Sequence, residues 1–253
     1  FRRVLFRSVK LGQQEAERIE SEEPLLPDRD PRVVELRAIG NRLVNALPPE
    51  LMRERPWKFT FNVIDKPEVN AFALPGGPIY FYSGLLNRMQ TKDEIAGVLA
   101  HEIIHVTNQH WASQYADNMK RRLGLLVVLN ILRAGDTVFD IAAAADTLYT
   151  LGYSRRHEEE SDRLGYDTMV KAGYNPLGMA ETFEFLASQG NSGAPEFLRT
   201  HPDSRRRAEN IRKRIREDGR RMPARQPRDS RAMAAGGTRT NSGGDRIPPR
   251  ERN

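Results

Sequence analysis

The chain has 253 residues, a length that suits one catalytic domain with extensions at its ends. Its formal net charge of +6 comes entirely from residues 219–253, where nine arginines stand against three acidic residues. The rest of the chain is formally neutral, so its charge does not indicate nucleic-acid binding. The absence of cysteine excludes disulfides and thiolate metal sites, so any metal must be held by histidines and carboxylates.

The two ends of the chain differ in composition from its middle. Residues 1–30 predict an N-terminal helical arm followed by a proline-rich linker. Residues 219–253 are rich in Pro, Gly, Ser and Arg, which predicts a disordered basic tail. Such a tail is either solvated without a partner or in contact with a polyanion or a membrane surface. The longest apolar stretch, 123–132, is about half of what a transmembrane helix needs, and residues 1–10 show no signal peptide.

Residues 31–218 predict one α+β domain that is mostly helical. Residues 33–47 repeat apolar side chains at helical spacing. Three short stretches bounded by Pro and Gly then predict the strands of a small sheet, at 58–64, 71–74 and 79–83. The sequence PGGP between the last two stretches is typical of a turn.

Most of the predicted helices follow the sheet. Thr91 and Glu94 form a capping-box pattern, which predicts that a helix begins at about residue 92 and runs to about residue 110. Further helices are predicted at about 119–133, 138–153, 156–171, 177–189 and 204–217.

The predicted helix at about 92–110 carries the sequence HEIIH at 101–105. Positions four apart lie on one face of a helix, so His101 and His105 can offer two ring nitrogens to one metal ion. Glu102, next to them, can reach a metal-bound water without being a ligand. The alternative is a helix with two histidines that are exposed or satisfied in the core.

A catalytic zinc needs a third protein ligand and an open position for water. The sequence EEESD at 158–162 offers candidates on another predicted helix. Glu158 and Asp162 share a face, so Glu158 can bind the ion while Asp162 accepts a hydrogen bond from a ligand histidine. This pairing favours Glu158 over Glu159 and Glu160. The alternative is a solvated acidic face balanced by neighbouring arginines.

Five segments together resemble the family-48 metallopeptidases, which include the HtpX, CAAX prenyl, BepA and LoiP types of protease. These segments are HEIIH at 101–105, EEESD at 158–162, NAFALPGG at 70–77, GLL at 84–86 and THP at 200–202. The resemblance covers about residues 31–215 and implies a gluzincin fold, in which a small sheet lies over the HExxH helix. With no visible transmembrane helix or repeat domain, the chain is most similar to the short soluble or lipid-anchored members.

The same resemblance assigns expected roles to individual residues. It implies one zinc per chain, with His101, His105 and Glu158 as ligands. Glu102 would be the catalytic base, and Asp162 would hydrogen-bond a ligand histidine.

Two further residues, His201 and Arg207, match positions that lie near the metal in the family. Either could stabilise an oxyanion, and His201 could instead occupy the open zinc position. The alternative for His201 is a residue at a proline turn before a helix. An edge strand with which an extended substrate can pair would comprise Asn70, Ala71, Phe72 and Ala73. An ordinary edge of a core sheet is the alternative for this strand.

The expected function is a zinc-dependent endopeptidase of unfolded or misfolded envelope proteins, in which Glu102 takes a proton from a metal-bound water. The resemblance implies a periplasmic protein, or one associated with the membrane on its periplasmic side. The partner is then an unfolded polypeptide, and nucleic acid is not expected. The rival interpretation is a zinc-holding, weakly active, chaperone-like module that binds extended chains. His110 is interpreted as structural.

Overall fold

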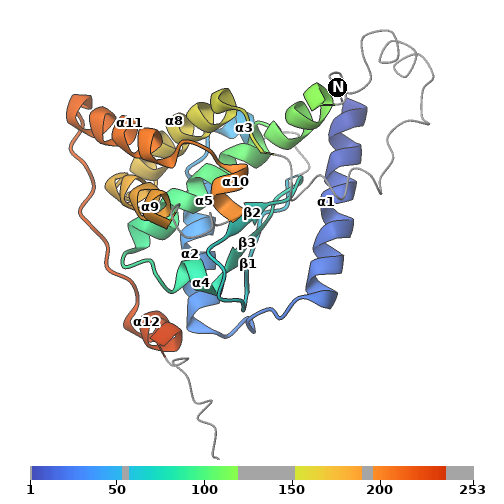
Figure 1. Ribbon diagram of the computed structural model, residues 1–253, viewed down its shortest axis with the longest axis horizontal. Coiled ribbons are helices and arrows are strands. Elements are labelled where there is room, and N and C mark those ends of the chain that lie inside the picture. The colour runs from blue at the N-terminus through green and yellow to red at the C-terminus, as the bar shows by residue number, and fades with distance from the viewer. Residues whose placement is uncertain (1, 53–56, 119–151, 190–195, 238–253) are drawn as a thin grey trace, which may run out of the picture.

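The structure is a computed structural model that describes residues 2–52, 57–118, 152–189 and 196–237 (Figure 1). Within these residues, a small sheet is enclosed between helices. The helices predicted at about 119–133 and 138–153 lie almost wholly outside the described residues.

The sheet comprises β1 (Thr60–Ile64), β2 (Ala71–Ala73) and β3 (Pro78–Tyr82), in the order β1-β3-β2. The central strand β3 is parallel to β1 and antiparallel to β2. The turn between β2 and β3 contains Gly76 and Gly77 at φ 99° and 126°, conformations that residues with a Cβ rarely adopt. The predicted strands and turn are therefore confirmed.

Helices cover both faces of the sheet (Figure 1). One face packs against α2 (Pro31–Asn45) and α5 (Lys92–Thr107), which share a continuous apolar core with it. The other face packs against α1 (Arg2–Glu22), whose Ala16 and Ile19 lie in an apolar cluster with Tyr80. The predicted N-terminal arm is therefore a helix that covers the sheet.

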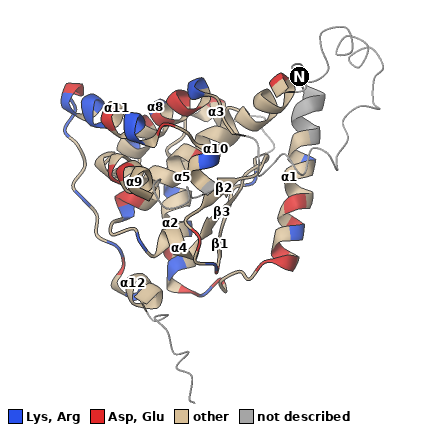
Figure 2. Cartoon of the chain, in the orientation of Figure 1, with Lys and Arg blue, Asp and Glu red and all other residues tan. Residues whose placement is uncertain are grey.

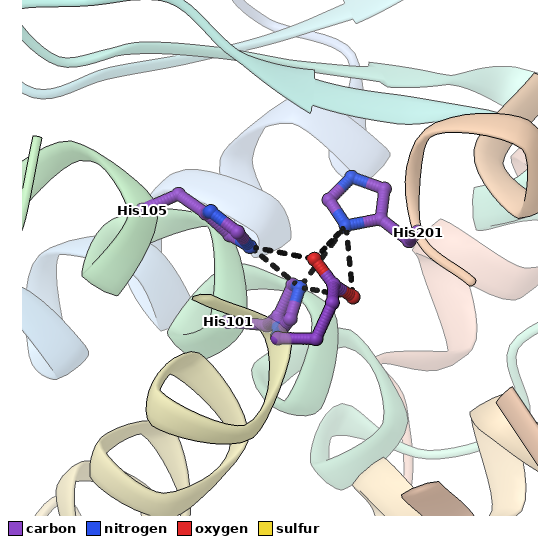
Figure 3. Close-up of side chains that lie close together, drawn as sticks. His101, His105 and His201 are labelled. Atoms are coloured by element: carbon purple, nitrogen blue, oxygen red, sulfur yellow. Dashed lines mark hydrogen bonds and ion pairs between the residues drawn. The ribbon is translucent and has the colours of Figure 1, made fainter. Parts of the chain in front are cut away.

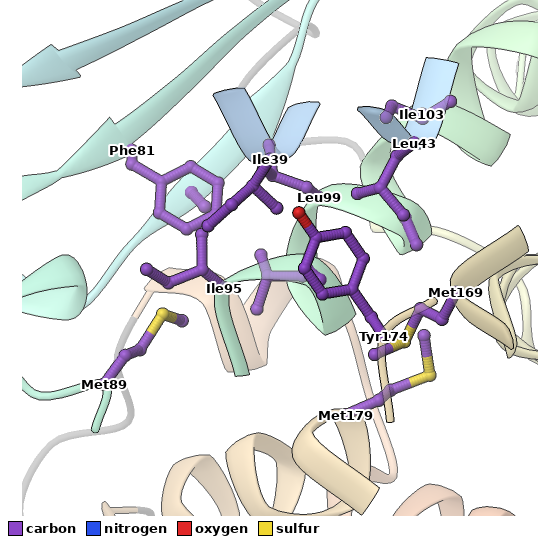
Figure 4. Close-up of a cluster of buried hydrophobic side chains, with 14 of the residues drawn as sticks. Ile39, Leu43, Phe81, Met89, Ile95, Leu99, Ile103, Met169, Tyr174 and Met179 are labelled. Carbon is purple, nitrogen blue, oxygen red and sulfur yellow. The ribbon is translucent and has the colours of Figure 1, made fainter. Parts of the chain in front are cut away.

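The helix α5 is central to the domain. Thr91 caps it by accepting a hydrogen bond from the backbone N–H of Glu94 at 3.2 Å, as the capping-box pattern predicted. The helix lies between the sheet and two later helices, α8 (Arg155–Lys171) and α9 (Leu177–Ser188). A Cβ at Gly97 would lie 2.6 Å from the Cα of Met179, so this glycine allows α9 to approach closely. Figure 4 shows the core around α5, which includes Ile39, Leu43, Phe81, Met89, Ile95, Leu99, Ile103, Met169, Tyr174 and Met179.

The remaining helices complete the domain. The long helix α11 (Ser204–Glu217) packs on α9 and α8. Four helices are short: α3 (Pro49–Met52), α4 (Ser83–Leu86), α10 (Glu196–Thr200) and α12 (Ser230–Gly237). The prediction of a mostly helical α+β fold with a three-stranded sheet is confirmed.

The predicted disordered tail needs a correction at its start, because residues 219–237 pack on the domain. The backbone N–H of Lys92 donates to the carbonyl of Gln226 at 2.9 Å, and the Arg228 guanidinium donates to the Glu35 carboxylate at 2.8 Å. Ala232 in α12 is completely buried. At least one arginine of this segment, Arg228, is therefore buried in an ion pair and not solvated. Residues 238–253 lie outside the described part of the chain.

Replacing Arg228 by methionine should destabilise the protein by about 3–5 kcal/mol, because it removes the cation beside the buried Glu35 carboxylate. The two side chains are only 1% and 4% exposed, and the guanidinium also donates to the carbonyl of Leu86 at 2.7 Å. Denaturant unfolding of Arg228→Met measures the effect, with Arg231→Met as the control, because Arg231 is an exposed arginine of the same segment. Equal unfolding midpoints would show that this ion pair does not hold the segment.

Candidate metal centre

The HExxH helix places its three functional candidates inside the protein. His101, Glu102 and His105 are each 2% exposed or less, although all three carry polar or ionisable side chains. The Nε2 atoms of the two histidines lie 2.9 Å apart and point to the same place (Figure 3). The helical spacing therefore brings two donor nitrogens together, as predicted from the i and i+4 positions.

Glu158 of α8 reaches the same point from a second helix. Its Oε1 lies 3.3 Å from His105 Nε2, and its Oε2 lies 3.6 Å from His101 Nε2. Donor atoms at zinc-ligand distances in a tetrahedron are separated from one another by roughly 3.3–3.6 Å. The separations found here, 2.9 to 3.6 Å, are close to that range, so these residues fit a zinc ion.

The acidic sequence of α8 divides into an inward and an outward part. Glu158 is 2% exposed, whereas Glu159 forms a surface ion pair with Arg206 of α11. Figure 2 shows acidic and basic residues along the neighbouring ribbons of α8 and α11. Glu160 is partly buried and accepts a hydrogen bond from Asn108 at 3.0 Å. The interpretation as a solvated acidic face therefore describes Glu159 and not Glu158.

Asp162 and Arg207 contact the ligand candidates His101 and Glu158. The Asp162 Oδ1 atom lies 3.0 Å from His101 Nδ1, the ring nitrogen that faces away from the cluster. Arg207 donates two hydrogen bonds to Asp162 at 2.7 Å and approaches Glu158 Oε2 at 2.5 Å. Burial alone would raise the pKa of Asp162, but Arg207 and His101 outweigh it and lower that pKa. Both carboxylates are therefore held as anions.

Arg207 itself is 2% exposed, and its guanidinium lies 4.0 Å from the centre of the Phe183 ring. Its polar contacts are with the carboxylates of Glu158 and Asp162 and with the His101 ring. Arg207 is therefore placed to hold these groups in position.

Glu102 is a buried carboxylate that makes a long ion-pair contact, with His201 Nε2 3.5 Å from its Oε1. Among the described residues, neither of its oxygens has a hydrogen-bond partner, although both are shielded from solvent. Burial raises the pKa of Glu102 to about 7, against the opposing effect of His201 and Arg207. A buried carboxylate without hydrogen bonds is destabilising, so its presence indicates a functional position.

His201 joins the cluster as a fourth donor. It directly follows α10, and its Nδ1 atom lies 3.2 Å from His101 Nε2 and 3.1 Å from Glu158 Oε1 (Figure 3). Its ring stacks on Phe197, with ring centres 4.4 Å apart. Burial disfavours a charged His201, but the carboxylates of Glu158 and Glu102 outweigh it and raise its pKa. The structure thus places His201 where a fourth metal ligand would lie.

The strand β2 borders this cluster. The strand order puts β2 at the edge, and within the described residues no further strand lies on its outer side. The backbone of Ala73 is close enough to Glu102 to lower the pKa of that carboxyl. The predicted edge strand therefore lies beside the candidate base.

Two residues beside the cluster were not predicted as functional. His110 is 2% exposed, and its Nδ1 atom lies 3.1 Å from His105 Nδ1. The ring of Tyr153 lies 3.9 Å from that of His105 and 5.2 Å from that of His201. A single tyrosine or histidine outside a spaced motif gives no signal in the sequence, so only the fold brings these residues to the site.

A buried HExxH helix whose histidines meet a glutamate of a second helix defines a metallopeptidase of the HExxH class. In agreement, residues 33–215 match Peptidase family M48, and the chain belongs to this family. The predicted membership of the family-48 metallopeptidases is thereby confirmed.

The chain is similar to several named proteases. It is 28% identical to the beta-barrel assembly-enhancing protease of Escherichia coli over 222 residues, which cover 81% of this chain and 44% of that protein. It is 28% identical to metalloprotease LoiP of Escherichia coli over 219 residues, 83% and 81% of the two chains. It is 31% identical to mitochondrial metalloendopeptidase OMA1 of Arabidopsis thaliana over 147 residues, 58% and 29% of the two chains. The chain thus spans less than half the length of the beta-barrel assembly-enhancing proteases that it matches.

Proposed function

We propose that this chain is a zinc-dependent endopeptidase that hydrolyses unfolded or misfolded polypeptides. His101, His105 and Glu158 are the zinc ligands, and Glu102 is the catalytic base. The observation that carries the proposal is the convergence of buried donor atoms from two helices, 2.9 to 3.6 Å apart, beside a buried carboxylate that has no hydrogen-bond partner among the described residues. A structural histidine pair would need neither feature.

When bound, zinc supplies Lewis-acid chemistry, in that it acidifies a water molecule and polarises a carbonyl group. Glu102 accepts the proton of the attacking water and returns it to the nitrogen of the leaving peptide. Asp162 holds the proton of His101 on Nδ1, which leaves Nε2 free to act as a donor atom. Arg207 holds Glu158 and Asp162 in place as anions.

His201 lies at the position that a catalytic site keeps open for water or substrate. In this arrangement the three ligands and His201 enclose a common centre, and Nε2 of His201 lies 3.5 Å from Glu102 Oε1. We propose that this is a resting arrangement, from which His201 must move before a peptide can reach the metal. We propose that the displaced ring then stabilises the oxyanion.

An extended substrate would bind along β2. Edge strands present backbone groups with which an added strand can pair, and such pairing depends little on side chains. Because Ala73 lies beside Glu102, a segment paired with β2 would bring its scissile bond near the base. This mode of binding suits a protease that acts on unfolded segments of many sequences.

We further propose that the substrates are envelope proteins and that the protein acts in the periplasm or at its membrane surface. The support is the similarity to a protease named for enhancing beta-barrel assembly. Within the described residues, no helix is both long and apolar enough to cross a membrane.

Metal analysis combined with proteolysis tests the proposal. The purified protein should contain about one zinc per chain and cleave an unfolded substrate such as casein. A chelator should stop cleavage, and added zinc should restore it. The chaperone-like alternative predicts instead that casein is retained without turnover in the zinc-loaded protein, and absence of zinc would contradict both interpretations.

A further inference from the structure

The two histidines of the HExxH helix differ in what supports them. His101 has the Asp162 carboxylate 3.0 Å from its Nδ1 atom, a common arrangement for a metal ligand. The corresponding atom of His105 faces another imidazole, because Nδ1 of His110 lies 3.1 Å away. Both rings are buried, at 2% exposure each, so no solvent competes for this contact.

We infer that His110 is a positioning residue for the proposed zinc ligand His105. Its Nδ1 atom accepts the Nδ1–H of His105, which keeps Nε2 of His105 unprotonated and aimed at the metal. The inference rests on the proposed function, since it concerns the support of one of its ligands.

The protons can be placed by elimination. A histidine that offers Nε2 to a metal carries its proton on Nδ1, and that N–H needs an acceptor. A neutral His110 can accept through Nδ1 only if its own proton is on Nε2. The hydroxyl of Ser161, 3.2 Å from His110 Nδ1, is a second potential donor to the single lone pair of that nitrogen. The opposite arrangement would put a proton on Nε2 of His105 and prevent it from binding metal.

Glu160 stabilises the required form of His110. Its Oε2 atom lies 3.4 Å from His110 Nε2, where the anion favours a proton on that nitrogen. Its other oxygen accepts a hydrogen bond from Asn108 at 3.0 Å, which fixes the carboxylate. A chain of contacts therefore runs from the metal position through His105 and His110 to Glu160.

The backbone is shaped to make this contact. In a continuous helix, a residue five positions after His105 would be rotated away from it by about 140°. Here α5 ends at Thr107, and Gln109 adopts φ 55°, a left-handed conformation that is costly for a residue with a side chain. This break turns the chain so that His110 faces back onto His105. Such strained positions are concentrated at functional sites.

A matched pair of substitutions tests the inference. Asparagine and leucine have the same branching, but only asparagine offers an acceptor oxygen near the position of the histidine Nδ1 atom. We expect His110→Leu to weaken zinc binding by about 10–100-fold, measured by competition with a chelator, and His110→Asn to recover most of that loss. His157→Leu, which removes the ring stacked on His110 but no acceptor, should bind zinc like the wild type.

The outcomes separate this inference from the proposed function. If the wild type binds no zinc, the proposed function fails. If the wild type binds zinc and His110→Leu binds it equally well, or if both His110 variants lose affinity equally, only the positioning role of His110 is overturned. Should His110→Leu not fold, long-range nitrogen NMR of the zinc-loaded wild type still decides. Protons on Nδ1 of His105 and Nε2 of His110 support the inference, and a proton on Nδ1 of His110 contradicts it.

Discussion

Glu102→Gln should lower kcat for peptide cleavage by about 10²–10⁴-fold while zinc content stays unchanged. Glutamine has the same shape as glutamate but cannot accept a proton from the attacking water. Glu102 is not among the atoms that surround the proposed metal position, so its replacement should leave the donor set intact. The measurement is casein cleavage together with the metal content of the same preparation.

The neighbouring surface glutamate provides the control. Glu159→Gln changes an exposed residue of α8 that pairs with Arg206, and it should cleave like the wild type. Glu158→Gln should instead lose zinc and activity together, because it alters a ligand. Full cleavage by Glu102→Gln would mean that another group acts as the base.

Arg207→Met should lower the free energy of unfolding of the zinc-free protein by about 3–5 kcal/mol, because two buried carboxylates lose their shared cation. Glu158 is 2% exposed and Asp162 is 6% exposed, and Arg207 contacts both. Measuring denaturant unfolding in the presence of a chelator removes the stabilisation that zinc itself would add. The same variant should bind zinc more weakly, since Glu158 and His101 are no longer held.

Arg206→Met is the matched control for this experiment. Arg206 is the preceding residue, is half-exposed, and pairs with Glu159 at the surface, where ion pairs contribute little. We expect its stability to stay within about 1 kcal/mol of the wild type. If Arg207→Met and Arg206→Met unfold at the same denaturant concentration, Arg207 does not have the structural role assigned to it.

The parts of the site that follow local rules could be predicted from the sequence. Positions four apart on a helix share a face, which brings His101 and His105 together and pairs Glu158 with Asp162 in the same way. The capping pattern at Thr91 fixed where α5 begins, and PGGP fixed the turn between β2 and β3. Each of these features depends on residues close together in the chain.

The missed features depend on long-range packing or on a break in a helix. The composition of residues 219–253 predicts a disordered tail that includes Arg228. Its partner Glu35 lies 193 positions earlier, and no local pattern connects them. Helical periodicity does not place His110 beside His105, whereas the left-handed Gln109 does. Tyr153 meets His105 only through the tertiary fold.

A crystal structure with anomalous diffraction at the zinc absorption edge would show directly whether this cluster binds zinc. We predict one peak per chain among Nε2 of His101, Nε2 of His105 and the carboxylate of Glu158, at distances of about 2.0–2.2 Å from each. No peak in zinc-supplemented crystals, or a peak that only other residues contact, would contradict the assignment of this cluster as the catalytic centre.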